Sequence, residues 1–364
     1  MKRLFALALG LFVGSLALAQ EPYPFTTTAI AEFNEPWALE FLPDGRLLVT
    51  EKAGTIQLVT QSGQKTEVAG APKVDYFFQG GLGDIVLHPD FASNNLVYLS
   101  FVEAGANETR GAAVARGTLN LAGSPRIENL EVIWRALPKV DGGLHFSHRI
   151  AFDADGLMYV SAGDRNKFDP AQDLNQNLGK IMRLNDDGTA AAGNPFASQG
   201  GIAAQIFSYG HRNLLGLAFD PQGRLWNIEM GPRGGDEINL VEAGNNYGYP
   251  LVSNGNHYDG KIIPDHDTDD RFTKPKVWWN PVISPSSLMF YTGEQFPDWK
   301  GSAFITGLSS MSIVRIAVNG DNAVEAQRFV MGKRMRGVEQ GPDGNIWAIE
   351  DGPGGRLVKL SPRR

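Results

Sequence analysis

Short apolar runs along this chain come in pairs, and each pair is separated by a turn rich in Pro, Asp and Gly. The pattern occurs in ALEFLPDGRLLVTEKAGTIQLV, DIVLHPDFASNNLVYLSF, RIAFDADGLMYVSAGD and GLAFDPQGRLWNIEMG. It returns in LMFYTGEQFPDWKGSAFITGLSSMSIVRI and in GVEQGPDGNIWAIEDGPGGRLVKL. Such turns between strand-like runs are typical of β-hairpins, and Asp44-Gly45, Asp155-Gly156 and Asp343-Gly344 are the clearest examples. The chain therefore predicts six repeats built around hairpins, with little helix.

Six repeats of this kind predict an all-β fold, a six-bladed β-propeller. One small sheet cannot bury its own faces, whereas sheets arranged radially cover one another and protect their edges. A pair of β-sandwiches is the alternative, but it does not explain the repetition. Extra length falls in segments 166–201 and 246–281. We expect these insertions to form walls of a site over one end of the central channel.

The first residues, MKRLFALALGLFVGSLALAQ, follow a different pattern. Two basic residues, an apolar run and small residues in that order predict a signal peptide over residues 1–19. The run is shorter than the ~20 residues that span a membrane, so we expect no stable membrane anchor, although an uncleaved one is the alternative. Residues 20–364 are then one propeller domain, exported to the periplasm or secreted.

Composition narrows the classes of function. The chain has 0 cysteines, so neither disulfides nor a lipid-modified cysteine contributes. Its net charge of −7 argues against nucleic acid as a partner, since phosphates call for a basic surface.

Histidines and an arginine stand at the entrance of one predicted strand, in DGGLHFSHRIAFD. Asp164 ends the second strand of the same hairpin, so pairing of the two strands would bring Asp164 to His145. A carboxylate on one ring nitrogen fixes the histidine tautomer and makes the other nitrogen more basic, as a general base requires. The alternative is a histidine that only satisfies loop hydrogen bonds, and for His148 we favour a structural role.

Other polar residues precede other predicted inner strands. Arg212 and Asn213, in SYGHRNLLGLAFD, offer a fixed cation and an amide to an anionic or oxygen-rich ligand. Gln79 stands in FFQGGLGD, while Arg334 and Arg336 alternate in GKRMRGVEQ and so point the same way. Each could be a surface residue, but a propeller would gather Gln79, His145, Arg212 and Arg336 around one central pit.

A third pattern is EMGPRGGDEINLVEAGNNYGYP, where glycines and Pro232 expose backbone carbonyls beside Asp236 and Glu237. Calcium takes six to eight hard oxygen ligands, including carbonyls. The spacing differs from an EF-hand loop, and a solvated acidic turn is the alternative. Zinc is not expected without cysteines or paired histidines.

These residues together resemble a known family, the soluble glucose and aldose sugar dehydrogenases that depend on calcium and pyrroloquinoline quinone (PQQ). The resemblance covers the predicted propeller domain, is most specific in YGHRNLLGLAFDPQGRLW and MGPRGGDEINLVEAGNNYGYP, and is closest to the bacterial aldose sugar dehydrogenases. It implies oxidation of an aldose to its lactone by hydride transfer to the quinone, with electrons passing to an unidentified acceptor. The chain is expected to be a monomer or a homodimer.

The resemblance also implies site residues. His145 matches the family's general base, Asp164 its orienting carboxylate, and Arg212 the residue that polarises the quinone carbonyl. The residues that match its quinone-binding positions are Gln79, Arg212, Asn213, Tyr258, Arg334 and Arg336. Those that match its calcium ligands are Gly231 and Pro232 for the calcium on the cofactor, and Glu237 and the Tyr247 carbonyl for a second, structural calcium.

Two positions depart from the family pattern. Leu144 stands where the glucose enzymes have Asp before the catalytic histidine, which bears on sugar selectivity. Ser309 is nearest to a cofactor-binding lysine that this chain lacks, so one positive contact to a trianionic ligand is missing. Two other functions stay open: a calcium-dependent propeller lactonase, which would need carboxylates around the axis, and a non-catalytic propeller that binds a partner.

Overall fold

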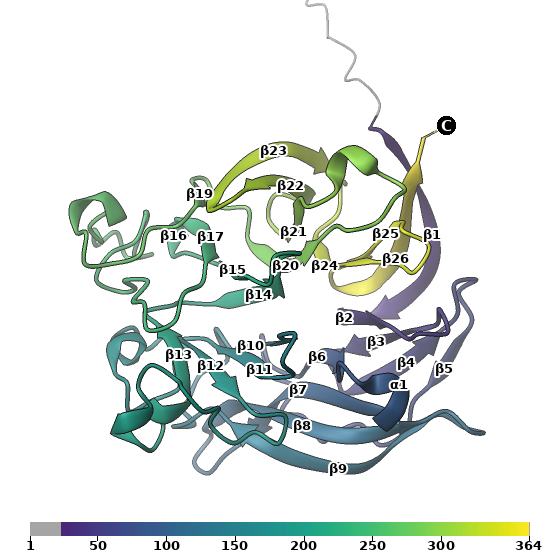
Figure 1. Ribbon diagram of the computed structural model, residues 1–364, viewed down its shortest axis with the longest axis horizontal. Helices are drawn as coiled ribbons and strands as arrows, with labels where there is room; N and C mark the ends of the chain where they lie inside the picture. The colour runs from purple at the N-terminus through teal and green to yellow at the C-terminus, as the bar shows by residue number, and fades with distance from the viewer. Residues whose placement is uncertain (1–22, 364) are drawn as a thin grey trace, which may run out of the picture.

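Six four-stranded sheets radiate from a common axis in the computed structural model, which describes residues 23–363 (Figure 1). We number the sheets as blades 1 to 6 in chain order. The predicted six-bladed propeller is confirmed, and the six hairpins read from the sequence are the first two strands of the six blades. The predicted signal peptide lies outside the described residues. No helix within residues 23–363 is long and apolar enough to cross a membrane.

The strands of the first three blades are, from the axis outward, as follows. Blade 1 is β2 (Pro36–Phe41), β3 (Leu47–Glu51), β4 (Thr55–Val59) and β5 (Lys65–Glu67). Blade 2 is β6 (Leu82–Leu87), β7 (Leu96–Ala104), β8 (Arg110–Asn120) and β9 (Arg126–Arg135). Blade 3 is β10 (Ser147–Phe152), β11 (Met158–Ala162), β12 (Lys180–Leu184) and β13 (Ile206–Tyr209).

The second half of the ring repeats this order. Blade 4 is β14 (Leu214–Phe219), β15 (Leu225–Glu229), β17 (Asp236–Leu240) and β19 (Val277–Trp279). Blade 5 is β20 (Pro285–Phe290), β21 (Ala303–Gly307), β22 (Ser312–Asn319) and β23 (Asn322–Val330). Blade 6 is β24 (Met335–Gln340), β25 (Ile346–Glu350), β26 (Pro353–Pro362) and β1 (Phe25–Asn34).

Smaller elements lie in the connections. A two-stranded ribbon joins β16 (Arg233–Gly234) to β18 (Gly255–Asn256), and α1 (Phe91–Asn94) is a single turn between β6 and β7. The remaining helices are 3₁₀ turns at Asp169–Gln172, Ala197–Gln199, Ala203–Gln205, His266–Thr268 and Pro297–Trp299.

The ring is closed by pairing the two ends of the described chain. Strand β1 runs antiparallel to β26, with Phe25 opposite Pro362 and Phe33 opposite Gly355. Blade 6 therefore combines three C-terminal strands with one N-terminal strand, and Figure 1 shows the purple and yellow segments side by side. Closure of this kind gives blade 6 its fourth, outermost strand and joins the two ends of the ring.

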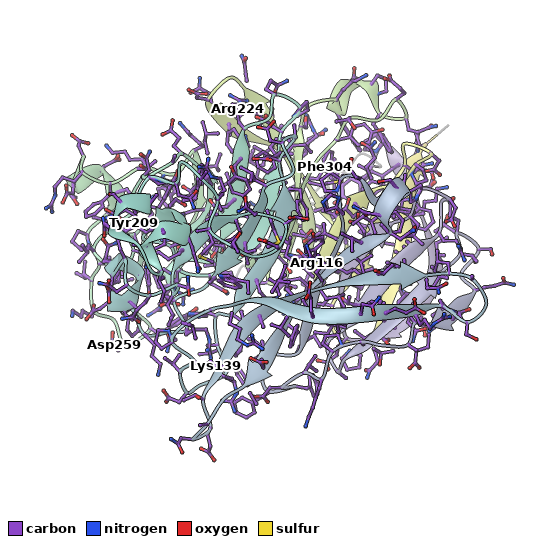
Figure 2. The ribbon with its side chains drawn as sticks, turned by 60° about the horizontal axis from the view of Figure 1, so that its bottom comes forward. Arg116, Lys139, Tyr209, Arg224, Asp259 and Phe304 are labelled. Atoms are coloured by element: carbon purple, nitrogen blue, oxygen red, sulfur yellow. The ribbon has the colours of Figure 1, made fainter. Side chains whose placement is uncertain are left out.

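The hydrophobic core is divided among the gaps between neighbouring blades. Trp37 and Leu48 of blade 1 pack with Leu99 of blade 2, and equivalent clusters fill each of the other five gaps. In Figure 2, Phe304 lies inside the molecule, in the cluster between blades 5 and 6. Each blade is thus buried only by its neighbours, which explains why every repeat carries two apolar faces.

The inner strand of each blade begins with an irregularity. Register shifts occur in β2, β6, β10, β14, β20 and β24, each within the first few residues of the strand. A β-bulge breaks the strict alternation of side chains and re-aims the extra residue. The residues left unpaired include Trp37, His148, Leu215 and Arg336, and all four line one cavity on the axis.

Candidate active site

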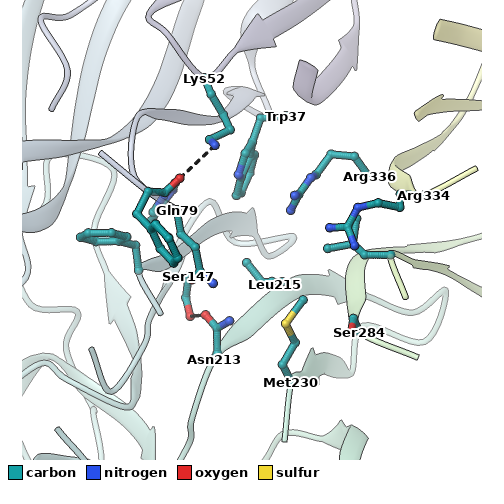
Figure 3. A pocket seen from close by; sticks show the side chains of 14 residues that line it. Trp37, Lys52, Gln79, Ser147, Asn213, Leu215, Met230, Ser284, Arg334 and Arg336 are labelled. Atoms are coloured by element: carbon teal, nitrogen blue, oxygen red, sulfur yellow. Dashed lines mark hydrogen bonds between the residues drawn. The ribbon is translucent and has the colours of Figure 1, made fainter. Parts of the chain in front are cut away.

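A cavity of about 260 Å³ lies at the end of the axis where the inner strands begin. Figure 3 shows Lys52 and Trp37 beside Arg334 and Arg336, with Asn213 across the space. The full set of lining residues is Trp37, Lys52, Phe78, Gln79, Phe146, Ser147, His148, Asn213, Leu215, Met230, Ser284, Leu308, Arg334 and Arg336. The charged residues in this set are all cationic, so the cavity is suited to an anionic ligand.

His145 and Asp164 form the pair that the hairpin predicts. The His145 Nδ1 atom lies 2.7 Å from Asp164 Oδ1, and both residues are buried. Asp164 also accepts hydrogen bonds from the backbone N–H groups of Asn166 and Phe168, so its carboxylate acts as an acceptor. The proton of the imidazole is therefore on Nδ1, which leaves Nε2 as the basic nitrogen.

The protonation of His145 is tuned by its surroundings. Burial lowers the pKa of His145; the hydrogen bond to Asp164 raises it and the charge of Arg212 lowers it, and the net result is below the ordinary value of 6.5. A histidine with a lowered pKa is neutral at neutral pH and can accept a proton there.

The backbone that carries His145 is strained. His145, Ser147 and His148 all have left-handed φ angles, of 50°, 60° and 58°. Such conformations cost energy in non-glycine residues and persist where the surrounding structure holds them. Here the His145 N–H donates to Gln79 Oε1 at 2.8 Å, which fixes Gln79 at the rim of the cavity. A Cβ atom on Gly163 would lie 2.1 Å from the His145 carbonyl oxygen, so this close approach requires glycine.

Arg165 holds the same loop from behind. Its guanidinium donates to the carbonyls of Leu144, Arg110 and Gly142, and it stacks on the Phe146 ring at 3.7 Å. Burial, and then the charge of Arg110, lower the pKa of Arg165 to about 10, so it stays charged at neutral pH. No motif in the chain pointed to Arg165, because its acceptors are backbone carbonyls.

His148 and Arg149 have structural roles below the cavity. His148 shares a hydrogen bond of 2.8 Å with Ser100 and stacks on Trp37, and burial lowers its pKa to about 3. A Cβ atom on Gly83 would lie 1.9 Å from the His148 ring, so glycine makes room for it. These contacts agree with the structural role predicted for His148, although its ring also lines the central cavity.

Arg149 connects several blades near the propeller axis. Its guanidinium donates to Asp84 Oδ1 at 2.9 Å, to the Leu215 carbonyl at 2.8 Å and to the Ser286 carbonyl at 2.7 Å. It also lies 3.9 Å above the centre of the Trp37 ring. One buried side chain of blade 3 therefore contacts blades 1, 2, 4 and 5 beneath the cavity.

Arg212 enters the site from the start of blade 4. Its backbone N–H donates to Glu229, its Nη1 donates to the Met230 carbonyl at 2.8 Å and to the Gly231 carbonyl at 2.5 Å, and its buried Nε has no partner among the described residues. The Arg212 carbonyl accepts the Asp164 N–H at 2.8 Å, so the start of blade 4 is bonded directly to the residue that orients His145. Arg212 lines the small cavity around Gly231 and not the central cavity, and its buried, unpartnered N–H marks a place where a ligand oxygen would be accommodated.

Gln79, Asn213, Arg334 and Arg336 line the central cavity, whereas His145 and Arg212, which were expected around the same pit, are not among its lining residues. The Ser147 hydroxyl donates to the Asn213 side-chain oxygen, which leaves the amide N–H groups for a ligand. Arg334 and Arg336 both donate to Asp351, at 2.8 Å each, so the two alternate residues point the same way. Burial alone would raise the pKa of Asp351, but the charge of Arg336 and the hydrogen bonds from both arginines lower it.

The predicted calcium region forms a second, very small cavity of about 10 Å³. Gly231, Pro232, Glu237 and Tyr247 all line it, together with His266. Glu237 is buried, its best hydrogen bond is 3.4 Å to Asn239, and His266 Nδ1 lies 3.8 Å from it without a partner. Burial, and then the charge of Glu229, raise the pKa of Glu237 well above its ordinary value. The carboxylate is under-partnered, as a cation ligand would be.

Asp236 is not part of this small cavity. Its two oxygens accept the N–H groups of Gly231, Ile283 and Ser284 at 2.7–2.9 Å. Asp236 therefore joins the Gly231 turn to the entrance of blade 5. Within residues 23–363 no three His, Asp or Glu side chains converge to hold a metal ion, so backbone carbonyls would have to supply most ligands.

Tyr258 lies away from the residues above. It is 73% exposed in the second insertion and does not line the central cavity. Its neighbour Asp259 stands at the edge of the molecule in Figure 2. The two insertions contact each other, since Gln172 bonds to Asn246 and to the Tyr249 carbonyl, and Tyr249 lies under Arg212.

Comparison with known proteins agrees with this geometry. The sequence profile of the family described as Glucose / Sorbosone dehydrogenase matches residues 33–359. The chain belongs to this family. It is similar to the aldose sugar dehydrogenase YliI of Escherichia coli K12, with 38% identity over 339 residues, which is 91% of each chain.

Two solved structures are also similar to this chain. The apo form of a soluble aldose sugar dehydrogenase from Escherichia coli superposes with a TM-score of 0.89 and 36% identity, covering 93% of this chain and 100% of that one. The PQQ-bound aldose sugar dehydrogenase from Streptomyces coelicolor superposes with a TM-score of 0.80 and 28% identity, covering 94% and 99%.

Two lining residues of this family member have no signal in the sequence. Lys52 follows β3 and Trp37 lies in the bulge of β2, and both line the cavity together with arginines of blade 6. Ser309, the residue nearest to the missing lysine, bonds to Ser284 and to the Val282 carbonyl.

Proposed function

We propose that this chain oxidises the anomeric carbon of aldose sugars to lactones, using pyrroloquinoline quinone and calcium. One observation carries the proposal: a buried His145–Asp164 pair stands beside a cationic cavity on the propeller axis, with the unpartnered Nε of Arg212 next to it. Membership of the glucose/sorbosone dehydrogenase family and the PQQ-bound relative support it.

The central cavity fits a flat, anionic quinone. Arg334 and Arg336 would bind carboxylates, Gln79 and Asn213 would bind carbonyl or ring groups, and Arg212 would use its free Nε. When bound, the quinone would supply the two-electron acceptor for hydride from the sugar, and calcium would supply Lewis acidity at its carbonyl. The family's aromatic contact from Tyr258 would require the second insertion to move, because Tyr258 is exposed here.

The small cavity fits calcium through oxygen ligands. Carbonyls of Gly231 and Pro232 would bind the ion on the cofactor, and Glu237 with the Tyr247 carbonyl would bind the structural ion. Two groups compete for these oxygens in the structure. Arg212 donates to the Gly231 carbonyl, and His266 Nε2 lies 3.1 Å from the Tyr247 carbonyl. Calcium would therefore share these carbonyls with Arg212 and His266, through the second lone pair of each oxygen.

The protein's own residues perform the proton chemistry. His145 Nε2 would accept the proton of the anomeric hydroxyl, while Asp164 stabilises the imidazolium that forms. Arg212 would stabilise negative charge that develops on the acceptor oxygen. The strained loop and Arg165 hold His145 in place, so little reorganisation is needed during the reaction.

A lactonase is the second candidate, and the lining of the cavity disfavours it. That function needs carboxylates around the axis to hold its metal, whereas the charged lining residues are Lys52, Arg334 and Arg336. A non-catalytic binding module would leave the His145–Asp164 pair without a purpose. The remaining parts of the proposal are export to the periplasm, an unidentified electron acceptor, and a monomeric or homodimeric state.

The proposal is tested by dye reduction with purified protein. We expect glucose or xylose to reduce an electron-accepting dye only when both pyrroloquinoline quinone and Ca²⁺ are added. 1,5-Anhydroglucitol is the matched control, because it lacks the anomeric hydroxyl and should give no reduction. Folded protein that binds the quinone but oxidises no aldose, or that hydrolyses gluconolactone instead, would refute the proposal.

Calcium should also stabilise the fold. At a Ca²⁺ concentration of 100 times Kd we expect about 2.7 kcal/mol of added stability, seen as a higher Tm that EDTA reverses. Glu237→Gln should remove the part of this shift due to the structural ion, because the buried carboxylate is lost. Glu242→Gln is the control, since Glu242 is exposed nearby and bonds only to Asn245 through its side chain. A Tm that does not respond to Ca²⁺ would contradict the calcium sites.

A further inference from the structure

Lys52 is a third cation in the central cavity, and it takes no part in the proton or calcium chemistry proposed for the site. It follows β3 in blade 1, next to Trp37, while Arg334 and Arg336 enter from the adjacent blade 6 (Figure 3). The three positive side chains therefore lie on neighbouring blades, on the side of the cavity that faces Asn213.

The local partners of Lys52 neutralise it only weakly. Its ammonium donates to the Phe78 carbonyl at 3.1 Å and lies 3.4 Å from Glu35 Oε1. Glu35 is shared, since it also accepts the Tyr76 hydroxyl. The Lys52 side chain is only 14% exposed, so water screens its charge poorly. An ammonium has three donors, and within residues 23–363 these are its two hydrogen-bond acceptors.

The positive side chains around the cavity are only partly neutralised by neighbouring carboxylates, which favours binding of an anion. Arg334 and Arg336 share the single carboxylate of Asp351, and Lys52 shares Glu35 with Tyr76. Three cations thus face two carboxylates, and neither carboxylate lines the cavity. Ser309 lies after β21 in blade 5, on the opposite side of blade 6 from Lys52. It is uncharged, and its hydroxyl is hydrogen-bonded to the Ser284 hydroxyl and the Val282 carbonyl.

We propose that Lys52 binds a carboxylate of the quinone and supplies the positive contact that Ser309 cannot. This inference rests on the function proposed above. Arg334 and Arg336 would bind two carboxylates of the trianionic quinone, and Lys52 of blade 1 would bind the third. Lys52 keeps its hydrogen bond to the Phe78 carbonyl and uses its remaining donor for the ligand.

Equilibrium binding of pyrroloquinoline quinone to the apoprotein tests this, with Ca²⁺ in excess and protein fluorescence as the readout. Lys52→Met should raise Kd about 10- to 100-fold, the range for losing one charged hydrogen bond. Lys52→Arg should retain most of the affinity, because the charge is kept. Lys65→Met is the matched control: Lys65 is an exposed lysine of the same blade, bonded to the Glu32 carbonyl, and its Kd should equal that of wild type.

The salt dependence of Kd separates binding from support of the loop. If Lys52 contacts the ligand, raising the ionic strength weakens binding less in Lys52→Met than in wild type. Unchanged salt dependence, with no rescue by Lys52→Arg, would assign Lys52 to holding the Phe78 loop and overturn the inference. Equal Kd values for wild type and Lys52→Met would overturn it as well. Absence of quinone binding by wild type would instead refute the proposed function itself.

Discussion

Replacement of His145 by alanine is expected to lower kcat with aldoses about 10²- to 10⁴-fold, the range for losing a general base. The reason is geometric: the Asp164 carboxylate holds Nδ1 at 2.7 Å, so Nε2 is the basic atom beside the cavity. Steady-state dye reduction with loaded enzyme measures the effect. Circular dichroism and Tm check that the variant folds.

The pH profile gives a second readout of the same residue. Only neutral His145 accepts a proton, and its pKa lies below 6.5, so kcat/KM should be flat near neutrality and fall below that value. Asp164→Asn removes the negative charge that helps to raise the pKa of His145, so the acid limb should move to lower pH while the maximum rate falls. His88→Gln is the control, since His88 bonds to Asp90 and Asn94 away from the cavity. Less than a tenfold loss in folded His145→Ala would contradict the assignment.

Arg149→Met should cost about 3–5 kcal/mol of stability, the range for breaking a buried ion pair from one side. Arg149 makes three hydrogen bonds to three blades and stacks on Trp37, and its removal leaves the Asp84 carboxylate buried without a cation. Thermal unfolding measures the loss. Arg46→Met is the control, because Arg46 pairs with Asp44 at the surface and should change stability by about 0–1 kcal/mol.

A double variant and pH separate the two contributions. Arg149→Met with Asp84→Asn should recover part of the loss, because no charge then remains unpaired. Burial raises the pKa of Asp84 and Arg149 opposes that rise, so the pKa climbs further in Arg149→Met. A raised carboxyl pKa means stability is lost as pH rises through it. The deficit of Arg149→Met should therefore shrink on acidification, and a deficit independent of pH would contradict this account.

The fold could be predicted because its signals are local. Each hairpin can be recognised from turn residues such as Asp44-Gly45. Six hairpins in six separate sheets, each with two apolar faces, have few arrangements that bury all of these faces. What local patterns do not encode is the closure, since β1 and β26 pair across almost the whole chain. The bulges were not predicted either, because they depend on how strands are packed at the axis.

The candidate site divides along the same line. His145 and Asp164 belong to one hairpin, and Arg334 and Arg336 to one strand, so their proximity follows from strand pairing and alternation. Lys52 and Trp37 reach the axis from blade 1 and Arg149 from blade 3, and only the closed ring shows that they meet. The exposed position of Tyr258 depends on the path of a long insertion, which carries no periodic signal.

The closure of blade 6 also sets an order of events during synthesis. Arg334 and Arg336 begin a blade that is complete only when β26 has paired with β1. Because synthesis starts at the N-terminus, β1 stays unpaired until β26 has been made. Blade 6, which carries Arg334 and Arg336, is therefore the last blade to be completed. If the proposed function holds, the quinone would meet both arginines only after β26 has been made, so loading of the cofactor follows completion of the chain.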